Sequence, residues 1–268
     1  MKVVLFCGGL GTRLRDYSDA LPKPMVPIGS RPILWHVMKY YAYFGHNEFI
    51  LCLGYKAGAI KEYFLRYSEA ASNDFVLSNG GRDLRLLASD IDDWTITFVD
   101  TGLNSNIGER LLAVREHVAD EDMFLANYAD GVSDMWLPGL ISELVDRPDA
   151  VASFMAVAPP LSFHITEFDE RGVVSSISPI RTSGLWVNAG YFALRSEIFD
   201  YLKPGEELVV EAFQRLAREH RLLAHPHDGY WGVMDTFKDK QALDEAYEKG
   251  PAPWELWKRQ QRPSTKTS

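Results

Sequence analysis

The sequence has little cysteine, no excess of positive charge and no long hydrophobic run. Its two cysteines, Cys7 and Cys52, both lie in apolar, strand-like stretches of the 268-residue chain. This placement favours small buried thiols in a reducing compartment over a disulfide or a catalytic thiol. The formal net charge of −9 argues against a general attraction to nucleic acid or to an anionic membrane. No stretch reaches the length of a membrane span.

Apolar residues are also few at the N-terminus. Only five of them follow Lys2 before the first glycine, fewer than the core of a signal peptide requires. We therefore expect a cytoplasmic protein whose partners are small molecules, with no nucleic-acid polymer and no membrane among them. The hydrophobic content of 46% is enough for one large α/β domain or two small ones.

A glycine-rich loop near the start carries the strongest chemical signal. The apolar run Val3–Cys7 predicts a buried parallel strand, and the loop follows it directly. Glycines let backbone N–H groups approach an anion closely, and nearby basic side chains add positive charge. This combination predicts phosphate binding. The residues that give the loop this character are Gly8, Gly9, Gly11, Thr12, Arg13 and Lys23.

Two familiar glycine loops do not fit this stretch. A Walker loop needs GxxxxGK followed by Ser or Thr, and no lysine follows these glycines at that spacing. The dinucleotide fingerprint GxGxxG needs a glycine where Leu14 stands. The remaining alternative is a plain turn between strand and helix, which the basic residues Arg13 and Lys23 disfavour.

Strand-like and helical segments alternate through the first half of the chain. A helix is predicted after Pro32, a strand over 48–53 and a second helix over 57–67. This alternation predicts an α/β fold with a Rossmann-like, mostly parallel central sheet and helices on both faces. Ligands of such sheets bind at the carboxyl ends of the strands, where the glycine loop lies.

The pattern changes from about residue 151. Strands are predicted over 84–88 and 94–99 before this point, and over 151–157, 163–168, 173–177 and 186–194 after it, of which 163–168 and 173–177 form a hairpin. No linker separates two independent units. We therefore expect a single domain over residues 1–260, with a smaller β-rich part in its second half and a disordered tail over 261–268.

Two aspartates are candidate metal ligands. Asp130 follows the buried run 123–128 after one residue, Ala129, and precedes a glycine. This suits Mg²⁺, which takes few protein carboxylates and fills its other positions with phosphates and water. Asp235 stands just before a helix predicted over 238–249. Capping of a nearby helix is the alternative for both residues.

Two further turns could contact a flat or hydroxylated ligand. The segment from Thr101 through Gly108 to Arg110 is a second glycine-containing strand-to-helix turn, and an ordinary loop is its alternative. The sequence Asn188-Ala189-Gly190 interrupts an apolar strand and leaves room for a polar ligand, or forms a β-bulge. Glu211 could reach the same ligand, although a surface glutamate is an equal alternative.

Other polar clusters favour structural interpretations. The acidic stretch 90–93 is interpreted as a solvated loop rather than a metal site. His36 has no partner at metal-ligand spacing, which favours a satisfied or surface histidine. His225 and His227 point the same way on an extended segment but lack a third ligand, so a metal site is disfavoured. Trp254 and Trp257 indicate a buried or interface contact.

The pattern GGxGTRL, followed about ten residues later by PKPM, resembles the signature of the sugar-phosphate nucleotidylyltransferases. The longer stretches LPKPMVPIGSRPILWHVMKYY, GYKAGAIKEYF, WGVMDTFKD and EKGPAPWELW are most similar to the branch formed by the glucose-1-phosphate cytidylyltransferases. The resemblance covers residues 1 to about 257. It implies transfer of a nucleotidyl group from a nucleoside triphosphate, CTP in this branch, to a sugar 1-phosphate, with Mg²⁺ as cofactor and pyrophosphate as product.

The resemblance also implies roles for individual residues and a division of the domain. Residues 1–135 are expected to bind mainly the nucleotide and residues 150–240 mainly the sugar, in a homo-oligomer. The catalytic residues would be Arg13 and Lys23, and the metal ligands Asp130 and Asp235. The nucleotide-binding residues would be Leu5, Gly8, Gly9, Gly11, Thr12, Arg13, Lys23, Thr101, Gly108 and Arg110. The sugar-binding residues would be Tyr128, Asn188, Gly190, Arg181 and Glu211.

One departure from the family pattern affects the sugar-phosphate pocket. Members of the family usually carry Glu-Lys-Pro ahead of the strand with the Asn-Gly-Gly sequence, and that lysine binds the sugar phosphate. The corresponding stretch here, 176–182, has no lysine, and Arg181 is expected to supply the charge from a shifted position. A non-catalytic sensor of nucleotide sugars is the alternative that this loss raises.

Overall fold

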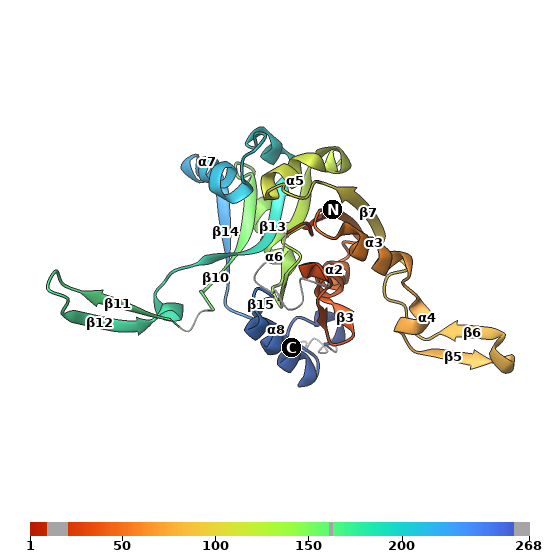
Figure 1. Cartoon of the computed structure of the whole chain (residues 1–268). Helices are drawn as coiled ribbons and strands as arrows, with labels where there is room; N and C mark the ends of the chain where they lie inside the picture. Colours follow the sequence, from red (N-terminus) through yellow and green to blue (C-terminus); the bar gives the residue numbers. More distant parts are fainter. Residues whose placement is uncertain (10–20, 161–162, 260–268) are drawn as a thin grey trace, which may run out of the picture.

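The computed structural model describes residues 1–9, 21–160 and 163–259, which are organised around a seven-stranded sheet (Figure 1). Its strands, in spatial order, are β14 (Leu222–His227), β10 (Ala152–Val157), β13 (Val187–Arg195), β8 (Met123–Asn127), β1 (Val3–Phe6), β4 (Glu48–Leu53) and β7 (Thr95–Asp100). Only β13 pairs antiparallel with its two neighbours. The predicted Rossmann-like, mostly parallel sheet is confirmed.

Helices cover both faces of this sheet, with α2, α6 and α8 on one face and α5 and α7 on the other (Figure 1). The α-helices are α2 (Ile33–Tyr43), α3 (Ala57–Leu65), α4 (Glu69–Ser72), α5 (Ile107–Ala113), α6 (Leu137–Val145), α7 (Phe213–Arg218) and α8 (Phe237–Glu248). Among the described residues, no helix combines the length and the apolar character that crossing a membrane would require.

Short strands and single turns complete the described chain. The short strands are β2 (Pro27–Ile28), β3 (Arg31–Pro32), β5 (Phe75–Ser78), β6 (Asp83–Leu86), β9 (Gly131–Ser133), β11 (His164–Phe168), β12 (Val174–Pro179) and β15 (Trp231–Val233). The helical turns are η1 (Lys23–Met25), η2 (Asn79–Gly81), η3 (Arg115–Val118), η4 (Ile180–Thr182), η5 (Ser196–Asp200), η7 (Leu256–Lys258) and the π-helical η6 (Leu208–Ala212).

The apolar run at the start of the chain reflects burial on both sides of the sheet. Val3 and Leu5 of β1 pack into the hydrophobic core under α2, whereas Val4 and Phe6 pack into the core under α5 and α7. A strand covered on both faces needs apolar residues at every position rather than at alternate ones. The prediction of buried free thiols is confirmed, since Cys7 and Cys52 are both buried and unpaired.

Two features of the strand pattern were not predicted. The strand predicted over 84–88 is present as β6, but its hairpin partner β5 was missed because the flanking sequence is polar. Strand β14 was predicted only as an extended segment around His225 and His227, because it contains Pro226. Proline is tolerated there because β14 lies at the edge of the sheet, where one side of the backbone needs no partner. The predicted tail over 261–268 lies outside the described residues.

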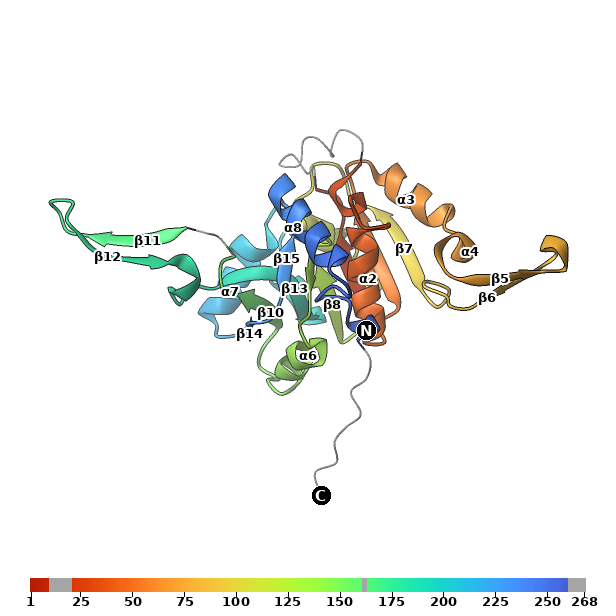
Figure 2. The same cartoon turned by 90° about the horizontal axis from the view of Figure 1, so that it is seen from below.

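Two hairpins, β5–β6 and β11–β12, extend from opposite ends of the sheet (Figures 1 and 2). We call them the first arm, residues 75–86, and the second arm, residues 164–179. Both carry exposed apolar side chains, such as Leu77, which is 57% exposed, and Ile177, which is 68% exposed. An isolated two-stranded ribbon is marginally stable at best in water.

The histidine of α2 is a core residue. His36 is 1% exposed, its Nε2 lies 3.2 Å from the carbonyl oxygen of Ile28, and its Nδ1 accepts a hydrogen bond from the indole of Trp254. Both ring nitrogens are therefore partnered, which confirms the interpretation of a satisfied histidine. Trp254 is fully buried, as one of the two sequence alternatives proposed. Burial lowers the pKa of His36 to about 4.

This lowered pKa predicts a loss of stability in acid. The ordinary histidine pKa is about 6.5. Between pH 6.5 and 4 the side chain of His36 is therefore protonated in the unfolded chain but remains neutral in the folded chain. The free energy of unfolding should fall by about 2.5 kcal/mol from pH 7 to pH 4.5 through this group alone. Urea denaturation should show a smaller fall for His36→Gln. Equal falls in the variant and the wild type would contradict the assignment.

Candidate functional site

A short antiparallel ladder brings the two candidate metal ligands together. Strand β9 pairs with β15 so that Gly131 lies opposite Val233, and the N–H of Met234 donates to the carbonyl oxygen of Asp130 at 2.9 Å. Asp130 and Asp235 therefore lie at the same end of the ladder, although 105 positions separate them in the sequence. They come from the two halves of the chain and meet beyond the carboxyl end of the central strand β8.

Lys23 bridges these two aspartates. Its Nζ lies 2.6 Å from Oδ2 of Asp130 and also within hydrogen-bond distance of Oδ1 of Asp235. The lysine lies in η1, whose backbone is constrained by Pro22 and Pro24 on either side. Its side chain is only 14% exposed. The structure thus gathers three of the residues that the sequence predicted, one cation and two carboxylates, around a single nitrogen atom.

Burial and pairing act against each other in this cluster. Burial lowers the pKa of Lys23, but the two carboxylates outweigh it, so the lysine pKa is raised and the ammonium stays charged. Burial raises the pKa of Asp130, and the opposing effect of Lys23 does not fully cancel it. Burial therefore destabilises the charged form of Asp130. Additional positive charge at the site would offset this effect.

The donor set suits a magnesium ion rather than a transition metal. Two carboxylates that contact the same nitrogen lie close enough to contact one small cation. Among residues 1–9, 21–160 and 163–259, no group of three or more metal-ligating side chains occurs. Zinc sites require at least three protein ligands, whereas Mg²⁺ is held by one or two carboxylates together with substrate phosphates. Asp130 and Asp235 therefore fit Mg²⁺ bound together with a phosphorylated ligand.

The backbone before Asp130 is strained. Ala129 is fully buried and has a φ of 61°, in the left-handed region that costs an L-residue about 1–2 kcal/mol. Its N–H donates to Oδ1 of Asn127 at 2.7 Å, and the hydroxyl of Tyr191 donates to the carbonyl oxygen of Gly131 at 3.0 Å. These two bonds hold the turn that presents the Asp130 carboxylate, and strain of this kind is typical of functional sites.

Glycine at this position should stabilise the protein. Ala129→Gly removes the left-handed penalty, and we expect the free energy of unfolding to rise by about 0.5–1 kcal/mol despite the greater freedom of glycine in the unfolded chain. Urea denaturation measures this change. Ala126→Gly is the matched control, because Ala126 is equally buried within β8, where glycine should destabilise. A loss of stability in Ala129→Gly would contradict the strain.

Arg110 lies beneath the glycine loop rather than in an open pocket. Its guanidinium is buried and donates to the carbonyl oxygens of Gly8, Leu53 and Gly102 and to the hydroxyl of Thr101. It thereby ties together the carboxyl ends of β1, β4 and β7. A Cβ at Gly8 would overlap this guanidinium, so Gly8 is required for close packing. In this structure the Arg110 side chain therefore holds the strand ends, and its contact with a nucleotide stays a prediction.

The other predicted nucleotide-binding residues fall into four groups. The side chains of Leu5 and Thr101 are buried. Only their backbone atoms, or the strand ends to which they belong, could contact a ligand. Gly108 is buried at the start of α5, where a Cβ would overlap the carbonyl of Glu206. Gly9 is exposed, with open space around its Cα. The predicted residues Gly11, Thr12 and Arg13 lie outside the described residues.

Three of the predicted sugar-binding residues lie together. The amide of Asn188 donates to the hydroxyl of Tyr128 at 3.1 Å, and the N–H of Gly190 donates to Oδ1 of Asn188 at 2.9 Å. Gly190 has a φ of 80° and lies against the ring of Tyr128, so glycine is needed both for its conformation and for the contact. The strand pairing of β13 with β10 is interrupted here, which confirms the bulge.

Arg181 and Glu211 do not join this group. Arg181 is exposed in η4, at the root of the second arm. The carboxylate of Glu211 accepts the N–H of Glu207 at 2.7 Å and so caps the start of η6. The prediction for Arg181 rested on its position in the sequence relative to the missing lysine. The sequence does not show where the second arm places this side chain.

The two histidines of β14 take separate carboxylate partners. His225 Nδ1 lies 2.8 Å from Glu143, and His227 Nε2 lies 3.1 Å from Asp134. The hydrogen bond that His227 donates to the carboxylate of Asp134 raises the pKa of His227.

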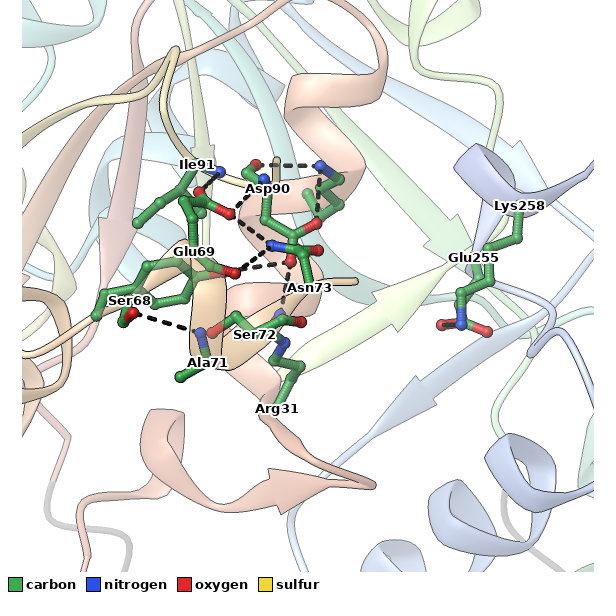
Figure 3. A network of polar contacts seen from close by, with 12 residues as sticks. Arg31, Ser68, Glu69, Ala71, Ser72, Asn73, Asp90, Ile91, Glu255 and Lys258 are labelled. Atoms are coloured by element: carbon green, nitrogen blue, oxygen red, sulfur yellow. Dashed lines mark hydrogen bonds and ion pairs between the residues drawn. The ribbon is translucent and has the colours of Figure 1, made fainter. Parts of the chain in front are cut away.

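The acidic stretch 90–93 is only partly a solvated loop. Asp90 pairs with Arg31 at 2.6 Å, and its N–H, together with that of Ile91, donates to the carboxylate of Glu69 (Figure 3). This network joins the root of the first arm to β3. The interpretation as a solvated loop was therefore wrong for Asp90, because the sequence does not show that the chain folds back onto Arg31.

Two residues with a clear place in the site were not singled out from the sequence. Asn127 fixes the turn before Asp130, and its signal was an amide at the end of an otherwise apolar run. Trp231 donates from Nε1 to the carbonyl oxygen of Ala189 at 3.1 Å and so connects β15 to the bulge of β13. A tryptophan in a short strand gives no such signal, because the partner lies far away in the sequence.

Comparison with known proteins places this geometry in context. Residues 2–246 match the family model described as nucleotidyl transferase. The chain is 37% identical to the glucose-1-phosphate cytidylyltransferase of Salmonella typhi over 258 residues, which cover 96% of this chain and 100% of that protein. It is 36% identical to the probable glucose-1-phosphate cytidylyltransferase of Bacillus subtilis over 259 residues, with the same coverage.

Solved structures show the same fold at lower identity. A putative glucose-1-phosphate thymidylyltransferase from Bacillus anthracis superposes with a TM-score of 0.66 at 16% identity, over 91% of this chain and 94% of that one. A UTP-bound UGPase from Acinetobacter baumannii superposes with a TM-score of 0.66 at 19% identity, over 93% and 94% of the two chains.

Proposed function

The chain belongs to the nucleotidyl transferase family, and from this premise we propose that it transfers a nucleotidyl group from a nucleoside triphosphate to a sugar 1-phosphate. The names of the relatives at 36–37% identity favour CTP and glucose 1-phosphate. The observation that carries the proposal is the contact of Lys23 with both Asp130 and Asp235 beyond the carboxyl end of β8. Phosphoryl chemistry needs a cation and metal-binding carboxylates at one point, and this cluster supplies both.

The reaction requires positioning and charge neutralisation. A non-bridging oxygen of the sugar 1-phosphate forms a bond to the α-phosphorus, and the bond from that phosphorus to the bridging oxygen breaks as pyrophosphate leaves. The attacking oxygen is already ionised, so no general base is needed. Lys23 would neutralise charge on the α-phosphate and Arg13 charge on the leaving pyrophosphate, while the backbone of the glycine loop holds the triphosphate.

Magnesium would be held by Asp130 and Asp235 together with phosphate oxygens, and it would neutralise phosphate charge there. The desolvation that raises the pKa of Asp130 supports this role, because a carboxylate buried at such a cost gains from a divalent cation nearby. Lys23 contacts both carboxylates and can contribute to the charge balance of the same site.

Pyrophosphate release tests the proposal. The protein would be assayed with Mg²⁺, four nucleoside triphosphates and several sugar 1-phosphates, with Lys23→Ala as the control for contaminating activity. We expect the fastest release with CTP and glucose 1-phosphate. Faster release with another pair would support nucleotidyl transfer but show that the substrates are not CTP and glucose 1-phosphate. No release with any pair, while nucleotides still bind, would contradict catalysis and favour a nucleotide-sugar sensor.

We further propose that the protein is a cytoplasmic homo-oligomer in which copies cover each other's arms. The exposed apolar residues of both arms support this, since a single chain leaves them in water. Two buried free thiols suit a reducing cytoplasm. Light scattering would measure the mass of the full chain and of a variant with Leu77→Lys in the first arm. A monomeric wild type would contradict the proposal.

A further inference from the structure

The proposed acceptor brings a charge that the cluster around Lys23 does not balance. A sugar 1-phosphate carries close to two negative charges at neutral pH. It must approach the α-phosphate of a second polyanion, so a cation is needed where its own phosphate binds. Lys23 is already committed to Asp130 and Asp235. Another basic side chain beside these carboxylates is therefore required, and this inference rests on the proposed function.

A cavity of about 760 Å³ lies directly beside Asp235, between β15, the start of α8 and the root of the second arm. Its volume is within the range of small-molecule sites. Aromatic side chains, Phe163 and Trp231 among them, form part of its wall, and sugar rings pack their apolar faces well on aromatic surfaces. The cavity thus offers a wall for the ring and, at Asp235, a direct connection to the proposed metal site.

Lys238 is the only basic side chain among the described residues that line this cavity. It lies in the first turn of α8, three residues after Asp235, and is exposed. Within the described part of the chain no carboxylate forms an ion pair with it. Its acidic neighbour Asp239 is engaged instead in a capping box with Thr236, and Lys240 pairs with Asp244.

Arg181 does not meet the same requirement. It is exposed in η4 and is not part of the cavity lining, whereas Lys238 and Asp235 both line it. The N-terminal end of α8 adds partial positive charge on the side where Thr236 and Lys238 lie, which strengthens an anion site already defined by the lysine and the cavity.

We propose that Lys238 binds the phosphate of the acceptor sugar in this cavity. The ammonium acts as a point charge on a flexible stem, so it can follow the phosphate toward the α-phosphorus without a fixed fork geometry. The aromatic wall then holds the sugar ring, and Asp235 marks the end of the cavity where the reaction takes place. The negative charge of the acceptor phosphate is thereby balanced by a residue of α8, Lys238, and not by Arg181 at the root of the second arm.

Steady-state kinetics of Lys238→Ala test this role. A charge-assisted hydrogen bond contributes about 1.5–3 kcal/mol, so we expect the KM for the sugar 1-phosphate to rise about 10- to 100-fold. The KM for the nucleotide should stay within about twofold, because Lys23 and the glycine loop are untouched. Lys238→Arg should restore most of the affinity. Lys249→Ala, at the far end of α8, is the matched control for charge and helix.

Calorimetry of the same variants separates this inference from the proposed function. Wild type should bind glucose 1-phosphate in the presence of an unreactive CTP analogue, and Lys238→Ala should bind it at least tenfold more weakly. A loss equal to that of Lys249→Ala, or a loss seen in Arg181→Ala instead, would overturn the role of Lys238 and leave the transferase proposal standing. Absence of binding and turnover for every sugar 1-phosphate in wild type would overturn both.

Discussion

Replacement of Lys23 by alanine is expected to lower kcat about a thousandfold. Its ammonium is the cation that the structure places between Asp130 and Asp235, and groups positioned to neutralise transition-state charge contribute about 10²–10³ in rate when removed singly. The KM for the sugar 1-phosphate should change much less, because the proposed contact with that phosphate comes from Lys238. Single-turnover measurements with saturating substrates would isolate the chemical step.

Stability provides a second measurement on the same variant. Without Lys23, two part-buried carboxylates face each other, and we expect a loss of about 2 kcal/mol at pH 7. The loss should shrink as the pH falls, because burial raises the pKa of Asp130 and the uncharged acid needs no cation. Added Mg²⁺ should stabilise Lys23→Ala more than wild type. Near-normal turnover would contradict the role assigned to Lys23.

Replacement of Arg110 by methionine is expected to destabilise the protein by about 3–5 kcal/mol. The substitution removes the printed donor to the carbonyl oxygen of Gly102. It also removes one of the donors to the buried carbonyl oxygens of Gly8 and Leu53, which keep bonds from the N–H groups of Tyr55 and Thr101. The ends of β1, β4 and β7 would then no longer be joined by hydrogen bonds to one guanidinium. Urea denaturation of the purified variant, compared with wild type, measures the effect.

Arg110→Lys tests the geometry without removing the charge. A lysine cannot satisfy four acceptors spread over three strand ends, so stability should fall by an intermediate amount, about 1–3 kcal/mol. Because Gly8 belongs to the glycine loop, the KM for the nucleotide should also rise. Wild-type stability and KM in Arg110→Lys would show that the guanidinium fork does not hold this edge of the sheet.

The contrast between Asp130 and Arg110 shows what the sequence can and cannot indicate. Asp130 follows an apolar run and precedes a glycine, so its place at the end of a strand follows from local pattern. Arg110 stands in an ordinary helical sequence, and its acceptors lie as far away as Gly8, 102 positions earlier. Whether an arginine binds a ligand or a backbone depends on such long-range contacts, which no local pattern contains.

The same distinction applies to the two sides of the site. Tyr128, Asn188 and Gly190 were predicted to share a site, and their hydrogen bonds and ring contact bring them together. Arg181 was chosen to fill a gap in a sequence pattern, but the second arm leaves it exposed and outside the cavity beside Asp235. The proposed contact with the acceptor phosphate comes instead from Lys238 in α8. From sequence alone, a lysine in a helix indicates only a solvent-exposed position.

The backbone strain at Ala129 could not be predicted either. A buried alanine before an aspartate suggests nothing unusual, and its φ of 61° becomes visible only with the hydrogen bond from its N–H to Asn127. That bond depends on the side-chain amide of the preceding strand. The strain therefore belongs to the tertiary structure and not to the local sequence.

Binding of Mn²⁺, as a spectroscopic substitute for Mg²⁺, tests the central claim most directly. Free Mn²⁺ would be measured by electron paramagnetic resonance in the presence of an unreactive CTP analogue. We predict that Asp130→Asn and Asp235→Asn each weaken Mn²⁺ binding at least tenfold relative to wild type, whereas Asp228→Asn, an exposed control seven residues before Asp235, leaves it unchanged. Equal Mn²⁺ affinity in all four proteins would contradict a metal centre at Asp130 and Asp235.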